Sequence, residues 1–65
     1  MEGMSERVLC LLVNGFEEIE ALAPVDILRR AGAEVVVASL EPTLRVTGRC
    51  QVTVEADVLL DEVAG

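Results

Sequence analysis

The sequence predicts an α/β fold in which a parallel sheet is covered by helices on both faces. Two solid apolar blocks, VLCLLV at 8–13 and VVVASL at 35–40, are typical of strands that are buried on both sides. Between them lies a stretch with the apolar periodicity and the charge distribution of a helix. Because a crossover between two such strands is nearly always right-handed, this βαβ unit predicts that the strands are parallel.

The first strand is expected at residues 7–13, where an Asn-Gly turn dipeptide ends it. A helix is expected at 17–31. Acidic side chains fill its first turn, and Arg29 and Arg30 fill its last, so both ends complement the helix dipole. Gly32 suits the position after the C-cap, where a left-handed backbone ends many helices.

The second strand is expected at residues 33–40, before Pro42 breaks the pattern. Apolar and polar residues then alternate at 45–46 and 51–55 around a Thr-Gly pair, which predicts a short hairpin at the rim of the sheet. Asp57 is expected to be the N-cap of a further helix that begins with VLLDEVAG.

The length of the chain limits what it can form alone. With 65 residues and two cysteines, it has a small core and at most one disulfide to support it. One full helix cannot cover both faces of a sheet, and the sequence stops just after a helix has begun. We therefore expect residues 1–65 to be the N-terminal part of a single α/β domain, whose remainder lies on a separate or missing segment.

The charge balance excludes several classes of partner. Five basic residues against twelve acidic ones give a net charge of −7, which argues against binding to nucleic acid or to anionic membranes. No stretch approaches the roughly 20 apolar residues of a membrane span, and the polar start lacks the features of a signal peptide. Two cysteines without an evident partner favour a reducing, cytoplasmic location.

Three glutamates lie at the start of the expected helix, followed by a proline within it. Glu17, Glu18 and Glu20 have an ordinary explanation, because carboxylates stabilise the positive end of the helix dipole. Helical spacing places Glu17 and Glu20 on one face and turns Glu18 away from it. Pro24 leaves the carbonyl of Glu20 without its helical donor and favours a local kink, which singles out Glu20 as a candidate catalytic acid.

Other catalytic groups are scarce in the sequence. Cys10 lies inside an apolar strand and is expected to be an inert, buried thiol. Cys50 follows Arg49 in a loop and is expected to be more exposed and somewhat more acidic. The chain has no histidine, no metal-ligand spacing and no glycine-rich phosphate loop, so we expect no metal and no cofactor. Without a nucleophile and base pair, it holds no complete catalytic site.

Residues 7–40 closely resemble the opening of the ThiJ/PfpI superfamily, in particular the branch of the Parkinsonism-associated protein deglycase. The resemblance rests on G-x-E-E-x-E from Gly15, P-V-D from Pro24 and R-R-A-G from Arg29. A later A-D-x-x-L segment from Ala56 matches as well. The resemblance implies a flavodoxin-like (Rossmann-like) parallel sheet sandwiched by helices, usually in a homodimer. It also implies a nucleophilic cysteine in the second half of the domain, beyond this chain.

The resemblance assigns roles to individual residues. Glu20 matches the glutamate that hydrogen-bonds the family's cysteine and takes part in proton transfer. Gly15, Arg30 and Arg49 become candidates for a substrate or anion pocket. Arg49 matches a second family arginine, which the dimer partner contributes near the cysteine. If the alignment is counted back from Asp57, however, Cys50 takes that place.

The implied activity is that of a cysteine-dependent glyoxalase or deglycase, acting on glyoxal, methylglyoxal or their protein adducts. An alternative within the superfamily is a non-catalytic sensor of oxidative stress or a chaperone; some members are named for thiazole biosynthesis or intracellular proteolysis. Outside that branch, a receiver-like or flavodoxin-like binding module and an amidotransferase-type relative remain alternatives. The expected partners are the C-terminal segment of the domain, a second copy of the protein and a small aldehyde.

Overall fold

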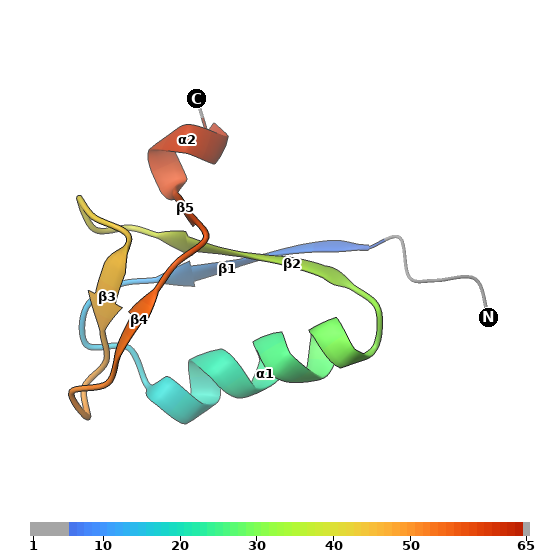
Figure 1. The fold of residues 1–65 in the computed structure, drawn as a ribbon, viewed down its shortest axis with the longest axis horizontal. Coiled ribbons are helices and arrows are strands. Elements are labelled where there is room, and N and C mark those ends of the chain that lie inside the picture. Colours follow the sequence, from blue (N-terminus) through green and yellow to red (C-terminus); the bar gives the residue numbers. More distant parts are fainter. Residues whose placement is uncertain (1–5, 65) are drawn as a thin grey trace.

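The computed structural model describes residues 6–64, which form a three-stranded parallel sheet, a two-stranded hairpin and two helices (Figure 1). The elements, in chain order, are β1 (Arg7–Leu12), α1 (Glu18–Arg30), β2 (Glu34–Ser39), β3 (Arg45–Thr47), β4 (Thr53–Glu55), β5 (Val58–Leu59) and α2 (Leu60–Ala64). The first strand, the long helix and the second strand each lie within a residue or two of their expected bounds.

The sheet has the order β1-β2-β5, and all its strands are parallel. β1 and β2 pair along their whole length, from Arg7 opposite Glu34 to Leu12 opposite Ser39. β5 is short and pairs only with the end of β2. The parallel pairing predicted from the βαβ pattern is therefore confirmed.

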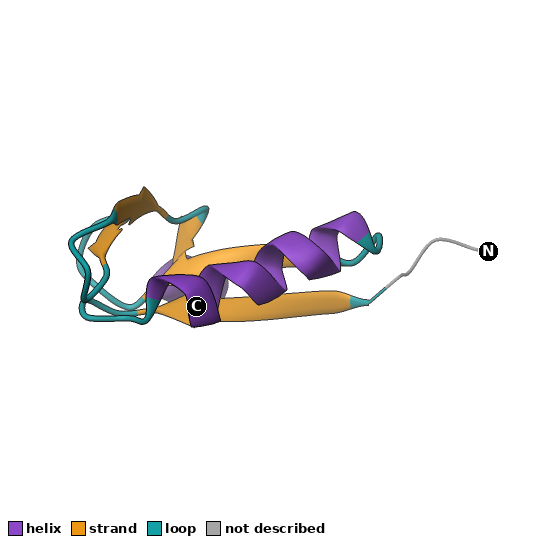
Figure 2. Cartoon of the chain, turned by 90° about the horizontal axis from the view of Figure 1, so that it is seen from below, coloured by secondary structure: helices purple, strands orange, loops and turns teal. Residues whose placement is uncertain are grey.

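α1 lies against one face of the sheet (Figures 1 and 2). It runs through Pro24 as one continuous helix and ends in a Schellman motif, in which the N–H of Ala33 donates to the carbonyl of Leu28 at 3.0 Å. Gly32 adopts the left-handed φ of 97° that this motif requires. Between helix and sheet lies a small apolar core of buried residues, namely Leu12, Phe16, Val25, Ala33, Val35, Val37, Val46 and Ala56.

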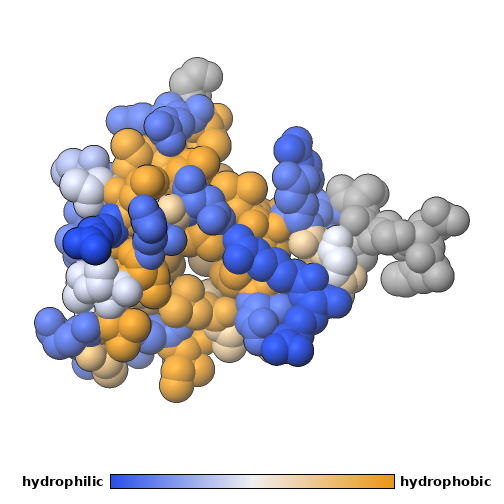
Figure 3. All heavy atoms as spheres, viewed as in Figure 1, coloured by the Kyte–Doolittle hydropathy of each residue, from blue (hydrophilic) through white to orange (hydrophobic). Residues whose placement is uncertain are grey.

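The opposite face of the sheet is open in the described part of the chain. Every second side chain from the middle of β1 to just beyond its end lies on this face. These side chains are about half exposed and belong to Leu9, Leu11 and Val13. Only α2 lies on this side, at one end of the sheet, and apolar side chains reach the surface beneath it (Figure 3). Coverage on both faces, expected from the apolar blocks, is therefore not reached by residues 6–64.

The expected hairpin is confirmed. β3 and β4 are antiparallel, with Val46 opposite Val54. The turn between them is closed by two hydrogen bonds, from the N–H of Gln51 to the carbonyl of Gly48 at 3.0 Å and from the N–H of Gly48 to the carbonyl of Val52 at 2.9 Å. Gln51 adopts a left-handed φ of 73°, which is uncommon for a residue with a side chain.

The prediction that Asp57 caps a helix is wrong. β5 intervenes, and Asp57 instead binds β2: its N–H donates to the carbonyl of Val37 at 2.8 Å, and its Oδ2 accepts the N–H of Val37 at 2.9 Å. The start of α2 is capped by Glu62, whose Oε1 accepts the N–H of Leu59 at 3.0 Å. Neither helix within residues 6–64 is long and apolar enough to cross a membrane.

Candidate active site

The loop between β1 and α1 meets the hairpin at the carboxyl ends of β1 and β2 (Figure 1). The N–H of Gly15 donates to the carbonyl of Thr47 at 2.8 Å, and the N–H of Thr47 donates to Oδ1 of Asn14 at 3.0 Å. The N–H of Arg49 donates to the carbonyl of Phe16 at 2.9 Å. Two of the predicted site residues, Gly15 and Arg49, are thus brought to one edge of the sheet, where open α/β folds bind their ligands.

Glu17 and Arg49 form an ion pair at this edge. Nη1 of Arg49 lies 2.7 Å from Oε2 of Glu17, and both side chains are more than half exposed. Glu17 is the N-cap residue of α1, but its side chain makes no capping hydrogen bond. An exposed pair of this kind contributes only about 0–1 kcal/mol to stability. Its main effect is to direct the guanidinium of Arg49 toward the start of α1.

Glu18 binds the hairpin turn, which sequence reasoning did not foresee. Its Oε2 accepts the N–H of Cys50 at 2.8 Å and the N–H of Val52 at 3.3 Å. Desolvation raises the pKa of Glu18, but these bonds and one from its own amide lower it further, so the net pKa lies below its ordinary value. The ordinary explanation by the helix dipole therefore does not account for all the contacts of Glu18. Helical periodicity cannot reveal a contact with a turn more than thirty residues away in sequence.

Glu20 lies in the first turn of α1 and is exposed. Among the described residues, none of the hydrogen bonds and ion pairs involves its carboxylate, in contrast to those of Glu17 and Glu18. The first turn of α1 therefore presents one carboxylate that neither the hairpin nor an arginine of the described residues engages. The catalytic role of Glu20 stays a prediction.

Arg30 lies at the other end of α1, away from this edge. Its Nε is 3.0 Å from Oδ1 of Asp26, an exposed pair one helical turn apart. Since α1 has 13 residues, at about 1.5 Å per residue it separates Arg30 from the edge by nearly 20 Å. Within this chain Arg30 therefore does not join Gly15 and Arg49, and its assignment to a pocket stays a prediction.

Arg29 does more than complement the helix dipole, which is the role that its place in the last turn of α1 predicts. Its Nη2 donates to the carbonyl of Val35 at 2.8 Å and lies 3.0 Å from Oδ2 of Asp57. Because Asp57 is bound to β2, this arginine ties the end of α1 to the segment that enters β5.

Neither thiol has the properties of a reactive cysteine. Burial is the main cause that raises the pKa of Cys10, and the charge of Arg29 only partly opposes it. Cys50 is exposed, as expected, but its pKa is raised rather than lowered, chiefly by the charge of Glu18 and further by burial and by Glu17. The predicted acidification of Cys50 is therefore wrong, because the carboxylates outweigh the neighbouring arginine.

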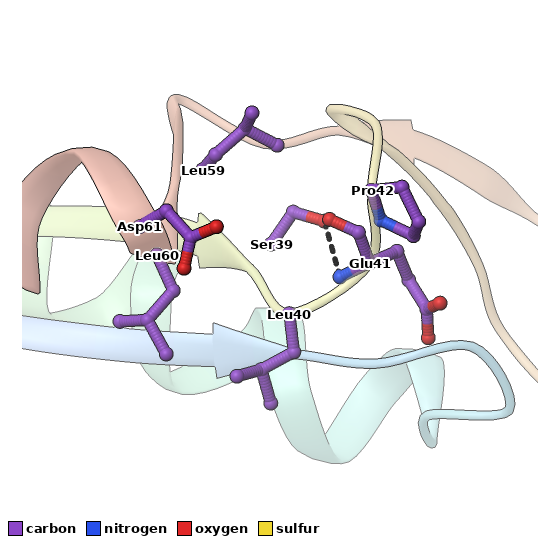
Figure 4. A pocket seen from close by; sticks show the side chains of 7 residues that line it. All are labelled: Ser39, Leu40, Glu41, Pro42, Leu59, Leu60 and Asp61. Atoms are coloured by element: carbon purple, nitrogen blue, oxygen red, sulfur yellow. Dashed lines mark hydrogen bonds between the residues drawn. The ribbon is translucent and has the colours of Figure 1, made fainter.

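A hollow of about 120 Å³ lies at the ends of β2 and β5 (Figure 4). Ser39 lies between Leu59 and Pro42 there, but its hydroxyl donates to the carbonyl of Thr43 at 2.6 Å and accepts the N–H of Glu41 at 3.0 Å. The hydroxyl of Ser39 thus serves to hold the backbone that follows β2. No cluster of three or more acidic or thiol side chains arranged to hold a metal ion occurs within residues 6–64.

Comparison with known proteins identifies the family. The sequence profile of the DJ-1/PfpI family matches residues 6–65. The chain belongs to the DJ-1/PfpI family. Among the curated relatives in this family, the chain is 50% identical over 58 residues to protein DJ-1 homolog A of Arabidopsis thaliana, covering 89% of this chain and 15% of the relative. It is 39% identical over 57 residues to a deglycase of Thermococcus kodakarensis, covering 88% of this chain and 34% of the relative.

The structure agrees with this membership. The oxidized form of Toxoplasma gondii DJ-1 superposes with a TM-score of 0.89 at 49% identity, covering 91% of this chain and 32% of that one. The parallel sheet with α1 on one face is thus part of the flavodoxin-like fold of DJ-1/PfpI proteins. The chain spans about a third or less of the length of these relatives.

Proposed function

We propose that this chain is the part of a deglycase-type DJ-1/PfpI enzyme that supplies the acidic partner of a catalytic cysteine. The observation that carries the proposal is the contrast among the three glutamates at the start of α1. Glu17 binds Arg49 and Glu18 binds the hairpin turn, whereas Glu20 is exposed and engaged by no described residue. A relative that shares 39% identity is named a deglycase.

The chemistry would proceed on glyoxal, methylglyoxal or their protein adducts. Glu20 accepts the proton of a thiol that belongs to the C-terminal segment of the same domain. The thiolate adds to the aldehyde carbon, and the proton returns from Glu20 to the carbonyl oxygen, which gives a neutral hemithioacetal. Gly15 would border the substrate in the same copy, and Arg30 would act near the dimer contact. Arg49, which matches an arginine that the dimer partner contributes, would border the substrate in the pocket of a second copy. We place this activity in the cytoplasm, where a thiol stays reduced.

The test uses a chimaera in which residues 6–64 replace the matched segment of the Thermococcus kodakarensis deglycase. Replacing Glu20→Gln keeps the size of the side chain but removes its basicity. We expect turnover of methylglyoxal to fall about 100-fold or more and the pKa of the catalytic thiol to rise. The matched control is Glu55→Gln, which removes one charge from an exposed site on β4. Turnover and thiol pKa that equal those of the chimaera would refute the role of Glu20.

A second candidate function is a sensor of oxidative stress. It is favoured by the solved relative from Toxoplasma gondii, whose structure is that of an oxidized form. In this case Glu20 would hydrogen-bond an oxidised cysteine rather than move a proton. Titration of the chimaera with hydrogen peroxide, followed by intact mass, separates the two functions. Sulfinate formation with little aldehyde turnover, slowed by Glu20→Gln, would favour the sensor over the enzyme.

A further inference from the structure

Glu18 binds the hairpin turn through its carboxylate, a contact that stabilisation of the helix terminus does not require. We propose that Glu18 is a positioning residue: its carboxylate fixes the β3–β4 turn against the start of α1 and so sets the direction of Arg49. The proposal rests on the proposed function, since it assumes that Arg49 borders the substrate. It assigns different tasks to three neighbouring acids, of which Glu18 acts only through the turn.

The geometry of the turn shows what Glu18 contributes. The two backbone hydrogen bonds of the turn, from Gln51 to Gly48 and from Gly48 to Val52, leave the N–H groups of Cys50 and Val52 without a backbone acceptor in the turn. Oε2 of Glu18 accepts both, at 2.8 Å and 3.3 Å. A single carboxylate oxygen thus binds the middle and the end of the turn, and both bonds are strengthened by its charge.

Gly48 supports the same conclusion from the other side. Its backbone does not adopt the left-handed conformation that Gly15 and Gly32 adopt, so conformational freedom does not explain a glycine here. A Cβ at this position would instead overlap the carboxyl group of Glu18. The glycine leaves the space through which Glu18 reaches the turn.

Arg49 depends on this arrangement because it lies inside the turn. Its backbone is fixed by the bond to the carbonyl of Phe16, and its guanidinium by Glu17. The ion pair with Glu17 is exposed and weak by itself. Without Glu18, the turn would keep one backbone hydrogen bond to the loop and this exposed ion pair, which together would hold the guanidinium less firmly in one direction.

The helix dipole alone does not account for these contacts. Any acid in the first turn of α1 satisfies the dipole, wherever its carboxylate points. Acceptance of two N–H groups requires an oxygen at one position, and a glutamine offers such an oxygen without the charge. The two explanations therefore differ in what they predict for Glu18→Gln.

The experiment measures amide exchange in the chimaera with the Thermococcus deglycase. In Glu18→Ala we expect the amides of Cys50 and Val52 to exchange about tenfold faster, while Glu18→Gln largely preserves their protection. Glu55→Gln is the control for loss of one charge from the hairpin region. Cys50 offers a second readout: its alkylation should accelerate in Glu18→Ala, because the carboxylate that raises its pKa is gone, whereas that of Cys10 should not.

Kinetics test the link to Arg49. We expect Glu18→Ala to raise KM for methylglyoxal about tenfold with a smaller change in kcat, and Glu18→Gln to restore most of the loss. Gly48→Ala, which displaces the carboxylate without removing it, should reproduce the exchange and the KM of Glu18→Ala. This variant keeps the test valid if Glu18→Ala folds poorly.

The outcomes separate the two proposals. Unchanged exchange at Cys50 and Val52 in both Glu18→Ala and Gly48→Ala would overturn the role of Glu18. A loss of thermal stability with KM unchanged would likewise reduce Glu18 to a structural residue. If instead exchange and KM respond as expected while Glu20→Gln keeps full turnover, the positioning role stands and the proposed catalytic role of Glu20 fails.

Discussion

Glu17, Glu18 and Glu20 lie within four positions of the chain but have different surroundings. The sequence indicated that they are not equivalent and correctly placed all three at the start of a helix. It could not show that Glu18 binds a distant turn, because periodicity describes only contacts within one element. For the same reason it predicted that Arg49, the neighbour of Cys50 in sequence, lowers the pKa of this thiol. In the structure Glu18, its neighbour in space, raises that pKa.

Gln51 provides a prediction for a single residue. Its φ of 73° lies in the left-handed region, where a side chain costs energy that glycine does not. Gln51→Gly should therefore stabilise the chimaera by about 1 kcal/mol in urea unfolding, after the greater freedom of glycine in the unfolded chain is subtracted. Gln51→Val should destabilise it, because a β-branched residue fits this conformation poorly. A loss of stability with glycine would contradict the conformation seen in the turn.

At the scale of elements, most of the fold could be predicted because the signals are local. Apolar blocks marked β1 and β2, and terminal charges with Gly32 marked the ends of α1. β5 was missed, since a strand of two residues gives no periodic signal and follows Asp57, a good N-cap residue. In the structure the carboxylate of Asp57 binds the backbone of β2 instead, and this contact depends on tertiary structure.

Asp57 provides the prediction at this scale, because it joins α1, β2 and β5. Asp57→Ala removes the acceptor of the N–H of Val37, a buried residue, and the partner of Arg29. We expect the free energy of unfolding of the chimaera to fall by about 1–3 kcal/mol. Asp57→Asn keeps an oxygen for Val37 and should lose less than Asp57→Ala. Equal losses for the two substitutions would show that charge, rather than the backbone contact, gives Asp57 its importance.

At the scale of the whole molecule, residues 6–64 form a sheet with one face covered by α1 and the other face exposed. The apolar blocks predicted burial on both sides, and residues 6–64 provide α1 on one of them. The cysteine that we propose as the partner of Glu20 cannot be predicted from this sequence, because neither Cys10 nor Cys50 matches it.

Leu11 tests whether a second layer covers the open face. It is 48% exposed in this chain and lies opposite Ala38 of β2. In the chimaera, Leu11→Ala should lower the free energy of unfolding by about 2–4 kcal/mol, as expected for a fully buried leucine. Glu55→Gln, at an exposed site, should change it little. A loss from Leu11→Ala as small as that from Glu55→Gln would mean that this face stays open.

The chain leaves the sheet after β2 and returns to it at Asp57, whose N–H already bonds to Val37. The hairpin is therefore an excursion whose two ends meet, so its length can change at little entropic cost and without shifting the strand register. A residue added at the tip between β3 and β4 would therefore move the side chains of the rim and leave the pairing of β2 with β5 as it is. The rim can change in length and charge without disturbing the sheet beneath it.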